Sequence, residues 1–319
     1  VSRVASSKIR RYFDPRTLFD IPKFFIGFFQ LLWKVFWFMP DVLFSKGGPG
    51  ALAAVLVCRF YRIPVIIHES DSIPGLTTKI SSYFSQRIAA SFASVRNYLK
   101  GDIAVVGNPI RRFLLSPGMT QEDAKRTFGF NSARPIILFI GGSQGAVRIN
   151  DFVLDVFEDL IKDFQVIHQT GIKNFDALQK ELRVITKNYA EEEKNRYKPF
   201  SYLEENLKSA FLAADIVISR AGSLSIFEIA YFEKPSILIP LPEAANNHQV
   251  KNAYEYAGTG AAVVIESANL TPNIFMSQLK KLISNPEVMK SMSAAAKNFY
   301  KPKAAKTIAE EILNLGNRE

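Results

Sequence analysis

Hydrophobic positions along this chain fall into short runs that alternate with longer amphipathic stretches. Runs rich in β-branched residues predict buried strands at 41–45, 64–69, 135–140, 165–171, 215–219 and 234–242. Apolar residues at helical spacing predict helices at 51–62, 147–160 and 224–232. Strands that alternate with helices in this way are typical of an α/β protein built on parallel sheets.

A glycine-containing turn follows the first strand of each of three such units. The turns read KGGPG at 46–50, GGSQGA at 141–146 and RAGS at 220–223. Glycine lets a backbone approach a ligand closely, and the helix that follows offers its first N–H groups and the positive end of its dipole. Because ligands of doubly wound sheets bind at the carboxyl ends of the strands, the last two turns predict a nucleotide or sugar-phosphate site.

One acidic residue follows the third turn at a position where it could bind a ribose. Glu228 lies six residues after Gly222, about two turns into the predicted helix. A carboxylate there can accept hydrogen bonds from the two hydroxyls of a ribose, as acidic residues do in other nucleotide-binding folds. The alternative is an exposed helix glutamate with no ligand.

Several classes of protein are excluded by motifs that the sequence does not contain. It has no G-x-x-x-x-G-K-[ST] motif of a P-loop nucleotidase, and no strand is followed by a full G-x-G-x-x-G of the dinucleotide type. It also has no Asp-x-Asp pair to hold a divalent metal on a diphosphate. With three histidines and the single cysteine Cys58, it offers neither a His/Cys metal site nor a disulfide framework. We therefore expect no metal and no cofactor.

The longest apolar stretch runs from Phe24 to Met39 and reads FFIGFFQLLWKVFWFM. It is shorter than the roughly 20 residues that span a bilayer, and a lysine lies inside it. A polar or small stripe along this helix is predicted at Lys23, Gly27, Gln30, Lys34 and Trp37, which recur at steps of four and three. An aromatic-rich helix of this kind beside basic residues fits the interface of an anionic membrane, and a helix buried in the core is the alternative.

Positive charge is concentrated in the first part of the chain. Lys and Arg exceed Asp and Glu by ten overall, and residues 1–133 carry the whole excess, with 18 basic and 8 acidic residues. Such a surface could face nucleic acid, an anionic membrane or an anionic substrate. Because the basic part contains no recognised nucleic-acid-binding motif, we expect no nucleic-acid partner.

Six motifs occur in the same order as in a known family. They read HESDSIPGLTTK at 68–79, VVGNPIR at 105–111, FIGGSQGAVRIN at 139–150, HQTG at 168–171, ADIVISRAGSLSIFEIA at 214–230 and PLPEAANNHQVKNA at 240–253. In these motifs the chain closely resembles the MurG family of peptidoglycan N-acetylglucosaminyltransferases, from about Lys8 to its end.

The resemblance implies a GT-B fold, with two Rossmann-like, doubly wound parallel-sheet domains and a cleft between them. We expect an acceptor- and membrane-facing domain at 1–117, a linker at 118–133 and a UDP-GlcNAc-binding domain at 134–303. The last helix, within 304–319, is expected to pack back on the first domain. The family opens with a strand and a glycine-rich loop, G-G-T-G-G-H, which this chain lacks, so the first domain is expected to be N-terminally incomplete.

On the donor side, the resemblance assigns UDP-GlcNAc to residues of the second domain. Arg111 is expected near the nucleotide, and Leu203 or Glu204 near the uracil. Glu228 is expected to take the ribose hydroxyls. The diphosphate is assigned to Gly142, Ser143, Gln144, Gly145, Ala221, Gly222, Ser223, Leu224 and Ser225, and the sugar hydroxyls to His248 and Gln249.

The family's reaction moves GlcNAc from UDP-GlcNAc to the C4 hydroxyl of lipid-linked MurNAc-pentapeptide, with inversion at the anomeric carbon. The implied partners are UDP-GlcNAc, undecaprenyl-diphosphate-linked MurNAc-pentapeptide and an anionic membrane surface, at the cytoplasmic face of the bacterial inner membrane. The implied processes are peptidoglycan synthesis and cell-wall biogenesis, and through them cell shape and cell division. Fixed N–H dipoles at the RAGS turn would stabilise the departing phosphate without a metal.

On the acceptor side, His68, Glu69 and Asp71 are expected at a strand end. His68 and Glu69 are the catalytic candidates within this chain, because the family's favoured base belongs to the absent G-G-T-G-G-H loop; for His68 we expect an orienting role before a base role. Two motifs depart from the family, since G-G-Y-x-S-G-P reads GGPGALA at 47–53 and H-E-Q-N reads HESD at 68–71. The alternatives are a related GT-B glycolipid synthase and a truncated remnant that binds UDP-sugar or membrane without catalysis.

Overall fold

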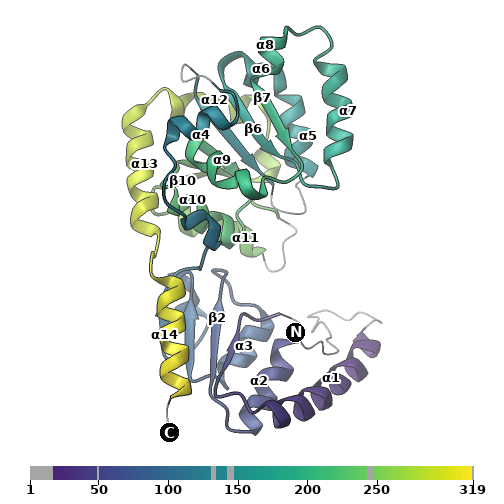
Figure 1. Ribbon diagram of the computed structural model, residues 1–319, viewed down its shortest axis with the longest axis vertical. Coiled ribbons are helices and arrows are strands. Elements are labelled where there is room, and N and C mark those ends of the chain that lie inside the picture. Colours follow the sequence, from purple (N-terminus) through teal and green to yellow (C-terminus); the bar gives the residue numbers. More distant parts are fainter. Residues whose placement is uncertain (1–16, 49, 131–133, 142–146, 243–246, 318–319) are drawn as a thin grey trace. The chain divides into compact units, whose positions relative to one another are not determined.

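The chain forms two α/β units, each built on one parallel sheet (Figure 1). The computed structural model describes residues 17–48, 50–130, 134–141, 147–242 and 247–317, without the side chains of 17–21 and 24. The first unit contains Val1–Pro109 and Lys301–Glu319, and the second contains Ile110–Tyr300. All of the strand pairings that the structure describes are parallel, which confirms the predicted α/β architecture.

The first unit has a four-stranded sheet in the order β1-β2-β3-β4. Its strands are β1 (Leu43–Ser45), β2 (Val65–Glu69), β3 (Arg87–Ala90) and β4 (Ile103–Val105), and its helices are α1 (Thr17–Phe38), α2 (Ala51–Phe60), α3 (Leu76–Ser82), η1 (Ala93–Asn97) and α14 (Ala304–Gly316). The core lies between α2 and the sheet and includes Val55, Cys58 and Ile67. Helix α14 lies along the sheet in Figure 1, where Arg87 Nε donates to Glu311 Oε1 at 2.9 Å.

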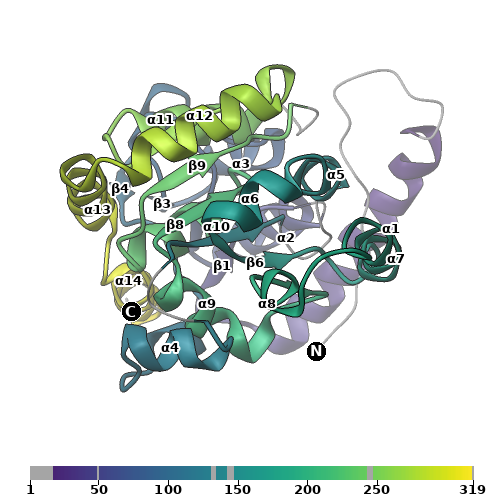
Figure 2. The same cartoon turned by 90° about the horizontal axis from the view of Figure 1, so that it is seen from above.

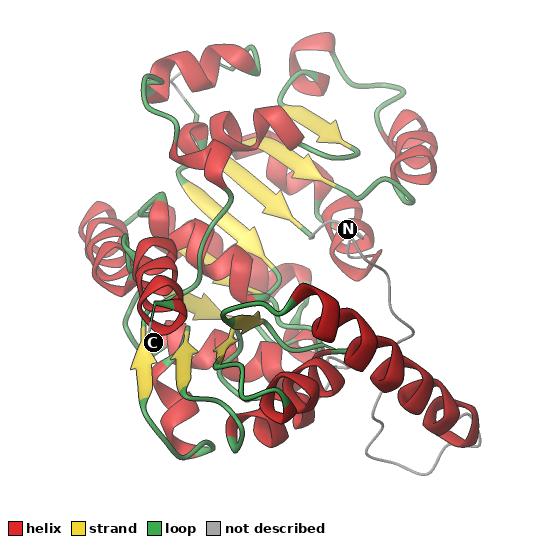
Figure 3. Ribbon diagram, turned by 60° about the horizontal axis from the view of Figure 1, so that its bottom comes forward, coloured by secondary structure: helices red, strands yellow, loops and turns green. Residues whose placement is uncertain are grey.

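The second unit has a six-stranded sheet in the order β10-β9-β8-β5-β6-β7, whose arrows point the same way in Figure 3. Its strands are β5 (Ile136–Ile140), β6 (Gln165–Gln169), β7 (Tyr197–Phe200), β8 (Ile216–Ser219), β9 (Ser236–Leu238) and β10 (Ala262–Val264). Its helices are η2 (Arg112–Leu115), α4 (Gln121–Thr127), α5 (Val147–Asp155), α6 (Phe157–Asp163), α7 (Phe175–Ile185), α8 (Glu191–Lys194), η3 (Glu204–Asn206), α9 (Leu207–Ala213), α10 (Ser223–Tyr231), α11 (His248–Ala257), η5 (Ser267–Asn269), α12 (Pro272–Ile283) and α13 (Pro286–Phe299).

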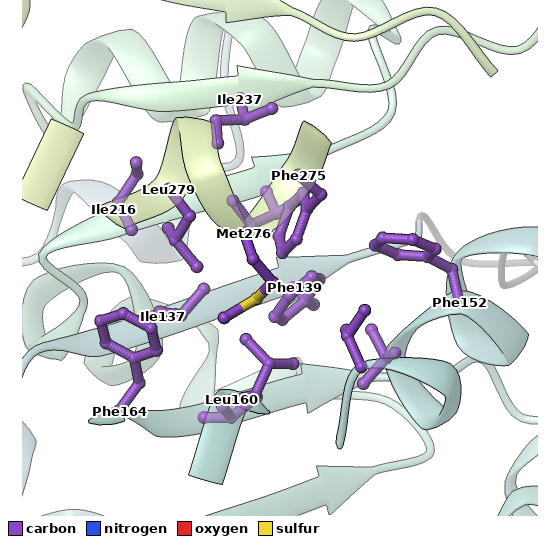
Figure 4. Close-up of a cluster of buried hydrophobic side chains, with 14 of the residues drawn as sticks. Ile137, Phe139, Phe152, Leu160, Phe164, Ile216, Ile237, Phe275, Met276 and Leu279 are labelled. Atoms are coloured by element: carbon purple, nitrogen blue, oxygen red, sulfur yellow. The ribbon is translucent and has the colours of Figure 1, made fainter. Parts of the chain in front are cut away.

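The core of the second unit explains why its strands read as continuous apolar runs. All five residues of β5 are buried, because helices cover both faces of the sheet. Figure 2 shows α12 on one side of the strands and α4 and α9 on the other. On the α12 side, Ile137 and Phe139 of β5 pack with Leu160 of α6 and with Phe275 and Leu279 of α12 (Figure 4).

Two predicted segments differ from the observed elements. The helix predicted at 147–160 is divided into α5 and α6 at Val156, whose backbone (φ −104°, ψ 11°) leaves the helical range. The break lets Val153 and Phe157 on either side of it both reach the core. Residues 118–133, predicted as a linker, include α4 and fall within the second unit, whereas α14 falls within the first.

Candidate functional site

Two predicted phosphate-binding turns begin at the same edge of the second sheet. Strands β5 and β8 are parallel neighbours, with Ile140 opposite Ser219. The chain therefore leaves both strands at one carboxyl edge, where Arg220 N–H donates to Ile140 O at 3.4 Å. Of the first turn, Gly141 is buried, whereas the candidates Gly142, Ser143, Gln144 and Gly145 lie outside the described residues.

The second turn leads directly into helix α10. Gly222 is the N-cap, with extended backbone and no side-chain cap, and the candidates Ser223, Leu224 and Ser225 form the first helical turn. Such an end presents backbone N–H groups and the positive end of the helix dipole. Ala221, the residue before the cap, is buried, and its carbonyl accepts a hydrogen bond from Asn252 Nδ2 of α11 at 3.3 Å.

Glu228 lies on α10, buried to 2% exposure and paired with an arginine. Arg111 Nε donates to Glu228 Oε1 at 2.6 Å, and Arg111 Nη2 donates to Glu228 Oε2 at 2.7 Å. Burial raises the pKa of the Glu228 carboxyl, while the hydrogen bond and positive charge of Arg111 act to lower it. The exposed-glutamate alternative is therefore wrong, and two residues predicted at the nucleotide lie together.

Tyr202 also belongs to this cluster, although the sequence did not single it out. Arg111 Nη1 donates to Tyr202 Oη at 3.3 Å. The next residue, Leu203, is buried, and its N–H donates to Gln169 Oε1 at 3.1 Å at the end of β6. Glu204 begins η3 with a positive φ of 29°.

The two sugar-binding candidates start helix α11. His248 is its first residue, and both His248 and Gln249 are half-buried. Gln249 Oε1 accepts a hydrogen bond from Leu241 N–H at 3.0 Å, which ties the helix to the chain that leaves β9. Through Asn252 the same helix contacts the turn before α10, so the donor candidates from α10 and α11 lie at one edge of the sheet.

The acceptor-side candidates lie at the end of β2 in the first unit. His68 is buried, with Nε2 3.0 Å from Gly107 O and 3.3 Å from Ser91 Oγ. A carbonyl can only accept, so Nε2 carries the proton and Nδ1 is unprotonated. Burial lowers the pKa of His68 to about 4. A base so weak and so enclosed is poorly suited to taking a proton from a substrate, which favours the orienting role.

Glu69 and Asp71 shape the turn that follows β2. Glu69 Oε1 accepts a hydrogen bond from Asp71 N–H at 3.1 Å. The same carboxylate also accepts hydrogen bonds from the Thr78 side chain and from the Gly75 backbone. Burial nevertheless raises the pKa of Glu69. Both carboxylates interact electrostatically with Lys46, a residue that sequence reasoning did not select.

Lys46 places a cation at the carboxyl edge of the first sheet. Its Nζ donates to Asn108 Oδ1 at 3.4 Å, and burial lowers the pKa of the ammonium group although Asp71 and Glu69 act to raise it. The signal that could have found it is its place directly after β1 and before Gly47, which has a positive φ of 76°. No group of three or more metal-type side chains occurs among the residues that the structure describes.

Comparisons with known proteins agree with this arrangement. Residues 136–308 match the glycosyltransferase family 28 C-terminal domain, and residues 1–90 match the family 28 N-terminal domain. A UDP-N-acetylglucosamine–N-acetylmuramyl-(pentapeptide) pyrophosphoryl-undecaprenol N-acetylglucosamine transferase of Clostridium kluyveri is 36% identical over 92% of this chain and 80% of its own length. The protein of the same name from Treponema denticola is 32% identical over 96% of this chain and 80% of its own length.

Similarity to a solved structure extends across both units. The crystal structure of Acinetobacter baumannii MurG matches with a TM-score of 0.74 and 26% identity, over 92% of this chain and 79% of that one. The two parallel-sheet units, together with the matched N- and C-terminal domains, place the chain in the class of GT-B glycosyltransferases of family 28. Within that class, the chain belongs to the MurG family.

Proposed function

We propose that this chain transfers GlcNAc from UDP-GlcNAc to the C4 hydroxyl of undecaprenyl-diphosphate-linked MurNAc-pentapeptide, with inversion at the anomeric carbon. The observation that carries this proposal is the shared edge of β5 and β8. There the N-terminus of α10, the buried Glu228 and helix α11 come together. The names of the MurG-family relatives supply the substrates.

Charge development explains what the donor side must do. As the bond between C1 of GlcNAc and the β-phosphate breaks, negative charge grows on the departing UDP. The N–H groups at Ser223–Ser225 and the dipole of α10 are fixed in place before the reaction, so they stabilise that charge without reorganising. In the same proposal Glu228 binds the ribose, and His248 and Gln249 bind the sugar hydroxyls.

The acceptor is assigned to the first unit. The lipid-linked diphosphate is anionic, and Lys46 provides positive charge beside the backbone of Gly47 and Gly48, whose positive φ values suit a tight turn. Lys46 also offsets the carboxylate of Asp71, which replaces an asparagine of the family motif. His68 acts by orienting the chain at Gly107 and Ser91.

A transfer assay tests the reaction directly. Radiolabelled UDP-GlcNAc is offered to the full chain with a lipid-linked MurNAc-pentapeptide or with diacylglycerol. The expected result is that only the lipid-linked MurNAc-pentapeptide gains radiolabelled GlcNAc. Transfer to diacylglycerol alone would instead identify a glycolipid synthase, and binding of UDP-GlcNAc without transfer to either acceptor would identify a non-catalytic binding protein.

A membrane-binding face is proposed on helix α1. Its outward side carries Phe25, Ile26, Phe29, Trp33, Phe36 and Trp37, all exposed. The opposite side, with buried Gly27 and half-buried Leu31 and Val35, faces the unit, so the stripe predicted from Lys23 to Trp37 does not lie on one solvent face. None of the helices in the described part of the chain has the length and hydropathy to cross a bilayer.

Basic residues border this aromatic face. Arg59 and Arg62 are exposed at the end of α2, beside Phe60, and the ring of Phe36 contacts Tyr61 with centroids 6.4 Å apart. Aromatic rings flanked by arginines suit the headgroup region of an anionic leaflet. We infer peripheral binding at the cytoplasmic face of the inner membrane, where the product would enter peptidoglycan synthesis and so serve cell shape and division.

Changing Phe29, Trp33 and Trp37 to serine is expected to lower the affinity for phosphatidylglycerol vesicles at least about a hundredfold, because each ring removes apolar surface from water on binding. These side chains are 65%, 67% and 70% exposed, so folding is expected to be unaffected. Vesicle sedimentation measures the effect. Tyr83→Ser, at an 81% exposed aromatic of the same unit, is the control. Wild-type sedimentation of the triple variant would remove α1 as the docking face.

A further inference from the structure

The Arg111–Glu228 pair leaves a defined number of acceptor positions on the carboxylate. Two ionised oxygens offer about four lone-pair positions, and the guanidinium fork takes one on each oxygen. Two positions remain. The 2′ and 3′ hydroxyls of a ribose require two acceptor positions. Glu228 can therefore bind Arg111 and a ribose at the same time.

Arg111 is itself held from several sides. Its Nη1 donates to Tyr202 Oη at 3.3 Å, and its Cζ lies 5.6 Å from the centre of the Phe113 ring. Arg111 directly precedes η2, Tyr202 follows β7 and Glu228 lies on α10. Three segments distant in sequence therefore fix one guanidinium, which is 30% exposed, against one carboxylate, which is 2% exposed.

We propose that Arg111 and Tyr202 are positioning residues for Glu228: Arg111 keeps the buried carboxylate ionised and directs its two oxygens, and Tyr202 holds the guanidinium in place. This inference rests on the proposed function, in which Glu228 binds the ribose of UDP-GlcNAc. In this inference Arg111 acts on Glu228 and not on the nucleotide itself. Tyr202, which the sequence analysis did not select, acts on Arg111.

The electrostatics of the site support these roles for Arg111 and Glu228. Burial raises the pKa of Glu228, and Arg111 is the group that opposes the rise. Helices α11 and α13 also pack against α10: Asn252 of α11 donates to the Ala221 carbonyl, and the ring of Phe299 of α13 lies on Phe227. The charged contact of α13 joins Lys297 to Glu233 just beyond α10, and neither residue is among the causes that shift the pKa of Glu228. Without Arg111 the carboxyl would protonate as the pH falls, and a protonated carboxyl accepts hydrogen bonds less well.

Calorimetric binding of UDP and of 2′,3′-dideoxy-UDP to the full chain at pH 6 and pH 8 tests the inference. The ratio of the two affinities isolates the ribose hydroxyls. In the wild type this ratio is expected to be the same at both pH values. In Arg111→Gln it is expected to fall about tenfold at pH 6 and to recover in part at pH 8, since hydrogen bonds to an ionised acceptor are the stronger ones.

Conservative variants separate charge from geometry. Arg111→Lys keeps the positive charge but cannot make the bidentate contact of the guanidinium. Its ratio of UDP to dideoxy-UDP affinity is therefore expected to be independent of pH and about threefold below that of the wild type. Tyr202→Phe removes one long hydrogen bond and is expected to lower the ratio about two- to threefold. Arg112→Gln, at the exposed neighbouring arginine, makes the same charge change and is expected to match the wild type.

The outcomes distinguish this inference from the proposed function. If Arg111→Gln weakens UDP and dideoxy-UDP equally at both pH values, Arg111 acts on phosphate or base, and the positioning role is overturned while the donor site stands. If the wild type itself does not discriminate between the two nucleotides, the ribose assignment of Glu228 fails first. Should Arg111→Gln not fold, Arg111→Lys and Tyr202→Phe decide, and wild-type ratios in both would reject the inference.

Discussion

Replacing Glu228 with alanine is expected to lower the affinity for UDP-GlcNAc about a hundredfold, because two hydrogen bonds from ribose hydroxyls to an ionised acceptor are lost together. Glu228 is the only acidic residue of α10, so no neighbouring carboxylate on this helix can replace it. Calorimetry with UDP-GlcNAc measures the loss. Sedimentation with anionic vesicles is expected to be unchanged, since α1 belongs to the other unit.

Two further measurements make this result specific. Binding of 2′,3′-dideoxy-UDP is expected to be equally weak in the wild type and in Glu228→Ala, because neither complex contains the ribose contact. Glu233→Ala is a matched control, since this glutamate lies just beyond α10 and forms an exposed pair with Lys297 at 2.7 Å. Unchanged affinity for UDP-GlcNAc in Glu228→Ala would refute the ribose assignment.

Six of the described strands could be predicted from the sequence, because a parallel sheet covered on both faces demands uninterrupted apolar runs. The strands β3, β4, β7 and β10 were not predicted. Every residue of β5 (Ile136–Ile140) and β8 (Ile216–Ser219) is buried, and both strands were predicted from their apolar runs. The shared edge of the two turns also followed, since parallel neighbours end at the same side of their sheet. The division of α5 from α6 at Val156 could not be predicted, because apolar spacing continues across the break.

The contacts that define the site were harder to predict than its elements. Glu228 was a candidate, but nothing local shows that Arg111, more than a hundred residues earlier, would occupy its carboxylate. Tyr202 and Asn252 act through a guanidinium and a backbone carbonyl, and neither contact has a pattern along the chain. Lys46 was missed for a related reason: its partners Asn108 and Asp71 come from other strand ends.

The other buried network of the second unit shows that enclosure alone does not mark a binding residue. His168 of β6 is fully buried, with Nδ1 2.6 Å from Tyr197 Oη and Nε2 3.1 Å from Asn150 Oδ1. Asn150 Nδ2 donates to Thr170 O, so Asn150 Oδ1 must accept and His168 Nε2 must carry the proton. Tyr197 then donates to Nδ1. The neutral imidazole has both partners, whereas a second proton would put a positive charge in the core and force Tyr197 Oη to accept instead of donate.

Acidification is therefore expected to destabilise the second unit through His168. Burial lowers the pKa of His168 to about 3, whereas in the unfolded chain it is near 6.5. Below pH 6.5 the unfolded state takes up the proton first, so stability is complete above that pH and is lost as the pH falls towards 3. Between pH 6.5 and pH 5 this one group is expected to lower the free energy of unfolding by roughly 2 kcal/mol.

His168→Gln isolates this contribution. Glutamine has an acceptor for Tyr197 and a donor for Asn150 but does not titrate, so the variant is expected to be about 1 kcal/mol less stable at pH 7 and the more stable of the two at pH 5. Hydrogen exchange of β5 and β6 peptides measures the reversal. Glu228, whose raised pKa acts in the opposite direction, is present in both proteins and cancels in the comparison. As a control, His68→Gln in the other unit is expected to leave exchange in β5 and β6 unchanged. If the wild type and His168→Gln lose the same stability between pH 7 and pH 5, His168 is not the source of the acid sensitivity.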